Sequence, residues 1–265
     1  MLKDIKVAAL QMQVPRNKEE GEKQIAELVA VASKGGVDMV GLSEDCVARN
    51  SEVRDGYDPL IFLSKIAKEN NVYLFGATVT LDENGKMYNT GFVFDREGNL
   101  ITTHNKIVLT PPEEEGGMTP GDKLTVFDTE FGKMALLVCK DSFHRYAAWF
   151  FDKIRKAGAD IVLVPSYSLN VSPRSIDLWV DSLKALAKWF DLYIIAPGTV
   201  GANSTDYPSF GHALIMCPNR DVLAEGSFDK VETLTATLDV KSLEDIRNTY
   251  GAKWQPKSVP EAKVE

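Results

Sequence analysis

Residues 134–141 read MALLVCKD, a run of five apolar residues that ends at a cysteine. An unbroken apolar run is typical of a strand buried on both faces, here Met134–Val138. Arg145–Lys156 has the apolar spacing of a helix, and Ile161–Val164 has the composition of the next buried strand. The stretch therefore predicts a strand–helix–strand crossover, with Cys139 at the end of its first strand.

The same alternation extends on both sides of this unit. Two kinds of pattern recur: short apolar runs that predict strands, and longer segments of helical period. The further strands of the alternation are predicted at Val7–Met12, Met39–Leu42 and Leu192–Ala196, and the helices at Asn17–Ser33, Pro59–Glu69, Ile176–Trp189 and Leu243–Asn248.

Two groups of extended runs predict hairpins instead. The first group is joined by DENG at 82–85 and REGN at 96–99, which are hairpin-turn compositions. Crossovers and hairpins together predict an α/β protein of two stacked mixed sheets, each covered by helices. We expect one domain over residues 1–265, with a polar tail at 253–265. The hairpin runs are Val72–Leu81, Met87–Asp95, Leu100–Val108, His212–Met216, Val222–Ala224 and Leu234–Asp239.

The composition excludes several classes of partner. A formal net charge of -8 argues against nucleic acid, because phosphate contacts need clustered Lys and Arg. No apolar run approaches the roughly 18 residues of a membrane span, and the charged N-terminus lacks a signal peptide's apolar stretch. Cys46, Cys139 and Cys217 are too few and odd in number for a disulfide framework. We therefore expect a cytoplasmic protein that binds neither membrane nor nucleic acid.

Familiar cofactor and metal signatures are missing. The chain has no Gly-x-Ser-x-Gly elbow, no phosphate-binding Gly-Lys-Ser/Thr loop and no Gly-x-Gly-x-x-Gly. His104, His144 and His212 lie far apart, without the spacing of metal ligands. We expect neither a metal nor a cofactor.

Three ionisable residues follow predicted strands. Glu44 follows the strand that ends at Leu42, Lys106 lies at the polar end of another, and Cys139 follows a third. Ligand sites gather at the carboxyl ends of strands in α/β sheets. Amides at the start of the following helix would favour the Cys139 thiolate. Together the three would supply a base, an oxyanion stabiliser and a nucleophile.

Each of the three residues also has an ordinary structural interpretation. A lone cysteine after an apolar strand is commonly core packing. A glutamate in the same place is commonly a solvated loop residue or a helix cap, and a lysine among polar residues is commonly surface. The flanking sequence decides between these interpretations.

The flanking sequence contains an ordered set of short motifs. They are KIVL at 106–109, TPGD at 119–122, VFDT at 126–129, FGK at 131–133 and VCKD at 138–141. This set resembles the nitrilase superfamily of carbon–nitrogen hydrolases, and the resemblance extends from Val7 to about Asp239.

The resemblance implies a fold, a site and a reaction. The implied fold is the four-layer α-β-β-α sandwich, assembled as a homodimer or higher homo-oligomer. The implied catalytic residues are Glu44, Lys106 and Cys139, with a second glutamate at Glu114 inside the triplet at 113–115. The implied reaction is hydrolysis of a small amide through a cysteine thioester. Lys106 and the backbone N–H of the residue after the cysteine would hold the oxyanion.

The substrate-facing sequence departs from the family's pattern. Ser43 replaces the usual proline, and Lys140 and His144 stand where other residues are usual. We expect Lys140, His144 and Tyr167 to bind substrate. Lys140, His144 and Arg145, which are cationic or can become so, would favour a carboxylate-bearing amide. Asp141, two residues after the cysteine, favours amide over nitrile chemistry.

Several alternatives use the same residues differently. An N-carbamoyl hydrolase or a nitrilase would need the same triad with another pocket. A non-catalytic member would bind a metabolite or a partner protein. A papain-like Cys/His hydrolase would need a supported histidine, for which no pattern is recognisable.

Overall fold

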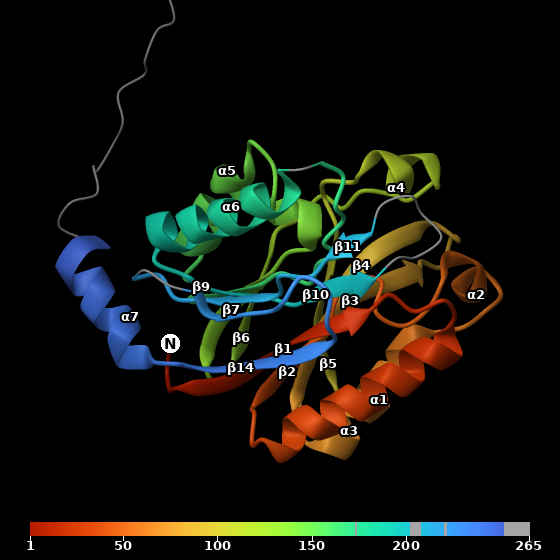
Figure 1. The fold of residues 1–265 in the computed structure, drawn as a ribbon, viewed down its shortest axis with the longest axis horizontal. Coiled ribbons are helices and arrows are strands. Elements are labelled where there is room, and N and C mark those ends of the chain that lie inside the picture. The colour runs from red at the N-terminus through yellow and green to blue at the C-terminus, as the bar shows by residue number, and fades with distance from the viewer. Residues whose placement is uncertain (173, 202–207, 220–221, 252–265) are drawn as a thin grey trace, which may run out of the picture.

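The computed structural model describes residues 1–172, 174–201, 208–219 and 222–251. Two β-sheets stack face to face in it. Helices α1 (Lys18–Lys34) and α3 (Pro59–Asn70) cover the outer face of one sheet, and α5 (Ala147–Lys156) and α6 (Ser175–Phe190) cover the other (Figure 1). The expected four-layer α-β-β-α arrangement is confirmed.

The first sheet is built around β1. In the described chain its order is β11-β10-β1-β2-β3-β4-β5, and β14 also pairs with β1. One edge of β1 is thus shared by two strands: antiparallel β14 along Ile5–Gln11 and parallel β10 along Gln11–Gln13. The strands are β1 (Ile5–Gln13), β2 (Met39–Gly41), β3 (Tyr73–Leu81), β4 (Met87–Phe94), β5 (Leu100–Asn105), β10 (Gly198–Gly201), β11 (Ser209–Phe210) and β14 (Glu232–Leu238).

The second sheet has the order β13-β12-β9-β8-β7-β6 over the described residues. Its centre, β7–β8–β9, is parallel and its flanks are antiparallel, as the mixture of crossovers and hairpins predicts. The strands are β6 (Thr125–Thr129), β7 (Gly132–Leu136), β8 (Ile161–Leu163), β9 (Tyr193–Ala196), β12 (Leu214–Met216) and β13 (Val222–Glu225).

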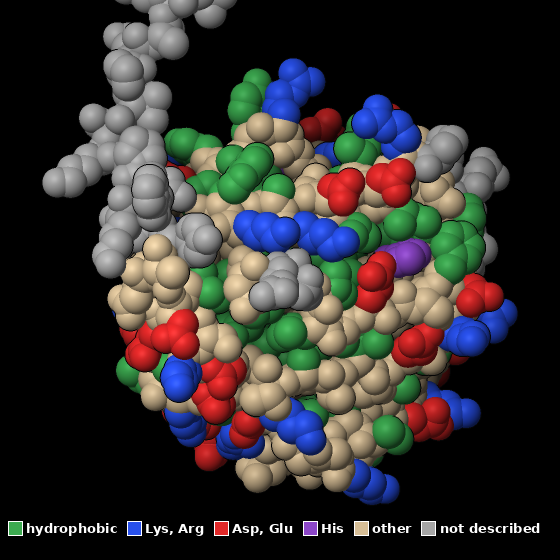
Figure 2. Space-filling view, turned by 60° about the vertical axis from the view of Figure 1, so that its left-hand side comes forward, with side chains coloured by type: hydrophobic (Ala, Val, Ile, Leu, Met, Phe, Trp, Pro, Cys, Tyr) green, Lys and Arg blue, Asp and Glu red, His purple; other side chains and the backbone are tan. Residues whose placement is uncertain are grey.

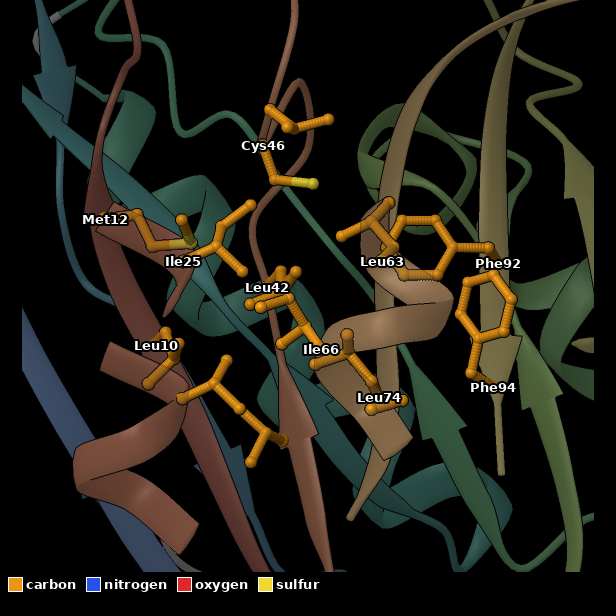
Figure 3. Packing of buried hydrophobic residues seen from close by; sticks show 14 of the residues in the cluster. Leu10, Met12, Ile25, Leu42, Cys46, Leu63, Ile66, Leu74, Phe92 and Phe94 are labelled. Carbon is orange, nitrogen blue, oxygen red and sulfur yellow. The ribbon is translucent and has the colours of Figure 1, made fainter. Parts of the chain in front are cut away.

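Three apolar clusters separate the four layers. Along β1, Leu10 and Met12 pack under α1, whereas Val7 and Ala9 face the second sheet. A third cluster lies between the second sheet and α5 and α6. Both faces of the central strands are buried, which explains their continuous apolar sequences. Figure 3 shows the first cluster, where Cys46 points among Met12, Leu42 and Leu63 and acts as core packing.

The remaining helices are short and lie near the sheet ends. They are α2 (Asn50–Arg54), α4 (Pro111–Glu115), the 3-10 helix η1 (Cys139–Ser142), α7 (Val240–Ile246) and the π-helical turn η2 (Arg247–Gly251). No helix within the described ranges is long and apolar enough to cross a membrane. The predicted tail at 253–265 lies outside the described residues, and the single-domain assignment stays a prediction.

Candidate active site

Glu44 and Cys139 are brought together by the loop that follows β8. The Glu44 N–H donates to the carbonyl of Ser166 at 3.3 Å, and the Cys139 N–H donates to the carbonyl of Pro165 at 2.9 Å. Glu44 follows β2 in the first sheet, whereas Cys139 follows β7 in the second. One loop thus joins the two stacked sheets at the edge where both side chains emerge.

Lys106 completes the cluster from the end of β5. Its Nζ donates to Oε1 of Glu44 at 2.7 Å, and to Oε1 and Oε2 of Glu113 at 2.8 and 2.9 Å. The lysine is 2% exposed. Burial alone would lower the pKa of Lys106, but the Glu44 and Glu113 carboxylates hold it well above its usual range. Lys106 is therefore a fixed ammonium between two carboxylates.

The second glutamate against Lys106 is Glu113, not the predicted Glu114. Glu113 is the third residue of α4, where Oε2 accepts from the Thr110 N–H and hydroxyl, both at 2.7 Å. Burial alone would raise the pKa of Glu113, but Lys106, Thr110 and Asn89 together lower it. Glu114 is exposed one position further on. Adjacent helical residues point about 100° apart, so only one of the two can face Lys106.

Glu113→Gln is expected to reduce kcat/KM for ammonia release about 10- to 100-fold, because a neutral amide holds the Lys106 ammonium less firmly. Glu114→Gln is the matched control and should keep the rate within about twofold, since this side chain is exposed. Steady-state rates of the two variants decide the assignment. A larger loss in the Glu114 variant would contradict it.

Cys139 has a strained backbone and a thiol whose pKa is raised. Its φ of 42° lies in the left-handed region, which residues other than glycine seldom adopt. Burial and the nearby Glu44 carboxylate raise the pKa of the thiol, although Lys106 and a hydrogen bond with the Tyr167 backbone oppose this. Burial thus acts against the predicted thiolate, which stays a prediction. The Glu44 carboxylate acts on this thiol, so a base stands close to the proton to be removed.

Asp141 ties the Lys106 segment to the Cys139 turn. Oδ1 accepts from the Ile107 and Val108 N–H groups at 3.0 and 2.8 Å, and Oδ2 accepts from the Val138 N–H at 3.1 Å. His104 Nε2 lies 2.9 Å from Oδ2. Asp141 is fully buried, so it acts on the substrate only through the two segments that it joins.

Asp141→Asn is expected to lower the free energy of unfolding by about 2–4 kcal/mol. An amide nitrogen would face N–H donors on one side of the side chain and leave them unsatisfied. Activity should fall as well, because Lys106 and Cys139 lose their common support. Urea unfolding followed by circular dichroism measures the change, with exposed Asp122→Asn as the control. Equal stability of the two variants would count against this role.

Asn89 was not singled out from the sequence. From β4, its Nδ2 donates to Oε1 of Glu44 and Oε1 of Glu113, both at 2.7 Å, so it spaces the two carboxylates around Lys106. Its strand reads MYNTGFVF, in which Asn89 is followed by the polar Thr90, so the sequence does not single out Asn89. Gly121 was quoted only as part of a motif. Its N–H donates to the Lys106 carbonyl at 2.8 Å, and a Cβ there would lie 2.1 Å from the Asn105 carbonyl oxygen.

The predicted substrate-binding residues differ in their surroundings. Tyr167 is buried, and its backbone contacts Cys139 as described above. Lys140 places its Nζ 5.0 Å from the centre of the Phe143 ring. His144 accepts from the Tyr146 N–H at 3.1 Å, and burial lowers the pKa of its imidazole. A role for these three in substrate binding stays a prediction.

Each histidine of the chain has a partner other than Cys139. His104 bonds Asp141, His144 accepts from Tyr146, and His212 Nδ1 lies 2.8 Å from Oε1 of Glu225. A papain-like Cys/His pair therefore does not match the described geometry, whereas a carboxylate beside the thiol does.

Known proteins with similar sequences and folds share this architecture. The family model of carbon–nitrogen hydrolases matches residues 6–248. Omega-amidase NIT2 of Mus musculus is 28% identical over 261 residues, 91% of each chain. Nitrilase homolog 2 of Dictyostelium discoideum is 25% identical over 266 residues, 93% of this chain and 79% of that protein.

Solved structures agree on the fold. Saccharomyces cerevisiae Nit3, a member of branch 10 of the nitrilase superfamily, has a TM-score of 0.84 at 24% identity, over 96% of both chains. An amidase from Nesterenkonia sp. AN1, with acrylamide added at its active-site cysteine, has a TM-score of 0.78 at 19% identity, over 92% of this chain and 97% of that one. The present chain belongs to the carbon–nitrogen hydrolase family, as an amidase-like member of the nitrilase superfamily.

Proposed function

We propose that this enzyme hydrolyses small amides through a thioester on Cys139, with Glu44 as base and acid and Lys106 as oxyanion stabiliser. The observation that supports it most strongly is that the buried Lys106 ammonium bonds Glu44, and that one loop holds the backbones of Glu44 and Cys139 together. The Omega-amidase NIT2 relatives support an amide substrate.

In the acylation step, Glu44 takes the thiol proton while Sγ of Cys139 attacks the amide carbon. The carbonyl oxygen becomes an oxyanion, stabilised by Lys106 Nζ and the backbone N–H of Lys140. The Lys106 ammonium has three N–H groups. One bonds Glu44, and a second can be shared between the two Glu113 oxygens, so the third is left for the oxyanion. Protonated Glu44 then gives its proton to the leaving nitrogen, and ammonia or an amine departs.

In the deacylation step, water attacks the thioester carbon as Glu44 removes a proton from it. The C–S bond breaks, the Cys139 thiol regains its proton from Glu44, and a carboxylic acid leaves. Because burial and Glu44 raise the pKa of the Cys139 thiol, we propose that proton removal accompanies attack in the first step. Glu44 is accordingly required in both halves of the reaction.

A panel of small amides, N-carbamoyl amino acids and nitriles tests this function. Release of ammonia alone from simple amides supports an amidase. Release of ammonia together with carbon dioxide from N-carbamoyl amino acids identifies an N-carbamoyl hydrolase. Preferential turnover of nitriles identifies a nitrilase. Turnover of none of these compounds contradicts the proposal and favours a non-catalytic binding protein.

We also propose that two copies associate through the α5–α6 layer. Tyr146, Trp149 and Trp189 are 67%, 57% and 63% exposed on or beside these helices. Figure 2 shows hydrophobic side chains among Lys and Arg on the upper part of the molecule, where this layer lies. Such aromatic surface is typical of interfaces. Light scattering should give a dimer or larger assembly that Trp149→Glu dissociates; a monomeric wild type would contradict this.

The three cysteines support a reducing location. None forms a disulfide, and the nucleophile must remain a thiol. We propose the cytoplasm as the site of action; fractionation of the native cells checks it.

A further inference from the structure

The residue after Glu44 has a buried oxygen that the described chain does not satisfy. Asp45 Oδ1 has no hydrogen-bond partner among the described residues. A buried polar atom without a partner costs free energy, so such atoms in native structures call for an explanation. The mechanism proposed above does not use this carboxyl.

Asp45 lies within the electrostatic reach of the catalytic cluster. The charges that act on it are those of Glu44, Glu113, Lys106 and Arg49. Burial and the adjacent Glu44 carboxylate raise the pKa of Asp45 to about 7. Asp45 in turn acts on the hydroxyl of Tyr167, a residue whose backbone contacts Cys139. Asp45 therefore belongs to the charged surroundings of Glu44 and Lys106 and follows Glu44 directly in the chain.

The two nearby cations are already engaged. The ammonium of Lys106 contacts Glu44 and Glu113, as described above. The Arg49 guanidinium donates to the Arg16 carbonyl at 3.5 Å and shares a hydrogen bond with the Tyr167 hydroxyl. Two carboxylates thus contact the one ammonium at the site, and Asp45 adds a third carboxyl that has no cation of its own in these contacts. A cationic group on the ligand would both pair with Asp45 and reduce the repulsion among the carboxyls.

The expectation of a carboxylate-bearing substrate rested on Lys140, His144 and Arg145, and two of these lie over aromatic rings. Lys140 lies over the Phe143 ring, and Arg145 lies over the Tyr146 ring at 6.0 Å. Burial lowers the pKa of His144, which favours its neutral form. The charges around the site therefore disfavour a carboxylate group on the amide substrate.

We infer that Asp45 binds an amino or ammonium group on the amide substrate, so that the enzyme prefers amino-bearing amides to uncharged or acidic ones. This inference rests on the proposed function and narrows its substrate class. Asp45 acts in selection of the substrate and takes no part in the bond changes at Cys139.

Asp45→Asn is a suitable test variant. Asp45 has a φ of 50°, and Asn accepts this left-handed conformation as readily as Asp does. The substitution keeps the shape and removes the charge. Asp55→Asn, at an exposed position ten residues further along, is the matched control.

The first measurement is kcat/KM for ammonia release from alaninamide, β-alaninamide and 4-aminobutanamide against propanamide, butanamide and succinamate. Wild type should prefer at least one amino-bearing amide about 10- to 100-fold over its uncharged match, the ratio expected for one hydrogen bond to a charged group. Asp45→Asn should cut that ratio about tenfold or more, and Asp55→Asn should keep it. An unchanged ratio in Asp45→Asn, no preference in wild type, or preference for succinamate would overturn the inference.

The second measurement does not depend on turnover. Calorimetric titration of Cys139→Ala protein with the same amino-bearing and uncharged amides should show tighter binding of an amino-bearing one, lost in Cys139→Ala/Asp45→Asn. If wild type hydrolyses no amide, the proposed function fails, and this titration still decides the role of Asp45. If Cys139→Ala and Cys139→Ala/Asp45→Asn each bind amino-bearing and uncharged amides equally well, the role of Asp45 is refuted.

Discussion

Cys139→Ala is expected to abolish ammonia release from every amide that the wild type hydrolyses, a loss of at least about 10⁴-fold. Removal of a nucleophile takes away the covalent route itself, and losses of this order or larger are typical. Cys139 begins η1, whose first turn is held by the backbone contacts of Cys139 with the Pro165 carbonyl and of Val138 with Asp141. The fold should therefore persist, as circular dichroism and the urea midpoint would show.

A second cysteine provides the control for this experiment. Cys217 donates to Oδ1 of Asn219 at 3.0 Å, a contact that a serine hydroxyl can replace. Cys217→Ser should keep wild-type rates. Ammonia release by Cys139→Ala at even a few per cent of the wild-type rate would remove Cys139 from the mechanism.

Lys106→Met is expected to impair both activity and stability. Loss of one oxyanion donor costs about 2.7–4 kcal/mol of transition-state stabilisation, or about 10²–10³ in rate. It also leaves the Glu44 and Glu113 carboxylates without their buried partner, which costs about 3–5 kcal/mol of unfolding free energy. Steady-state kinetics and urea unfolding measure the two effects.

Two further variants separate the effects. Lys156→Met removes an exposed lysine paired with Asp152, so it should change stability by no more than about 0.5 kcal/mol. Lys106→Met/Glu113→Gln should recover part of the lost stability, because one uncompensated charge is gone. It should recover no activity. A double variant as fast as wild type would show that Lys106 only balances charge.

The strands that the sequence predicts well are those whose burial dictates their residue types. β7 and β8 lie between apolar layers on both sides, so their runs leave little choice of structure. The strand β10 was missed because its segment, Gly198–Gly201, contains two glycines, which lack a side chain to reveal periodicity. α2 and α4 are too short for a helical period to show.

The order of the motifs predicted Glu44, Lys106 and Cys139, which the structure brings together, but it did not predict which second glutamate contacts Lys106. Three consecutive glutamates at 113–115 carry no periodicity that singles out one of them. The usable signal lies upstream, since Thr110 and Glu113 have the spacing of a capping box, with Pro111 as the first helical residue. The role of Asn89 depends on contacts among three separate segments, which no local pattern reveals.

The shared edge of β1 has a consequence for how the enzyme is made. β1 lies near the beginning of the described chain and β14 near its end, yet the two pair over seven residues. The ribosome synthesises β1 long before β14, so this edge of β1 lacks its antiparallel partner during most of translation. Pairing at such sequence separation also slows folding. Chains that stop short of β14 would expose this apolar edge, and their expected fate is aggregation.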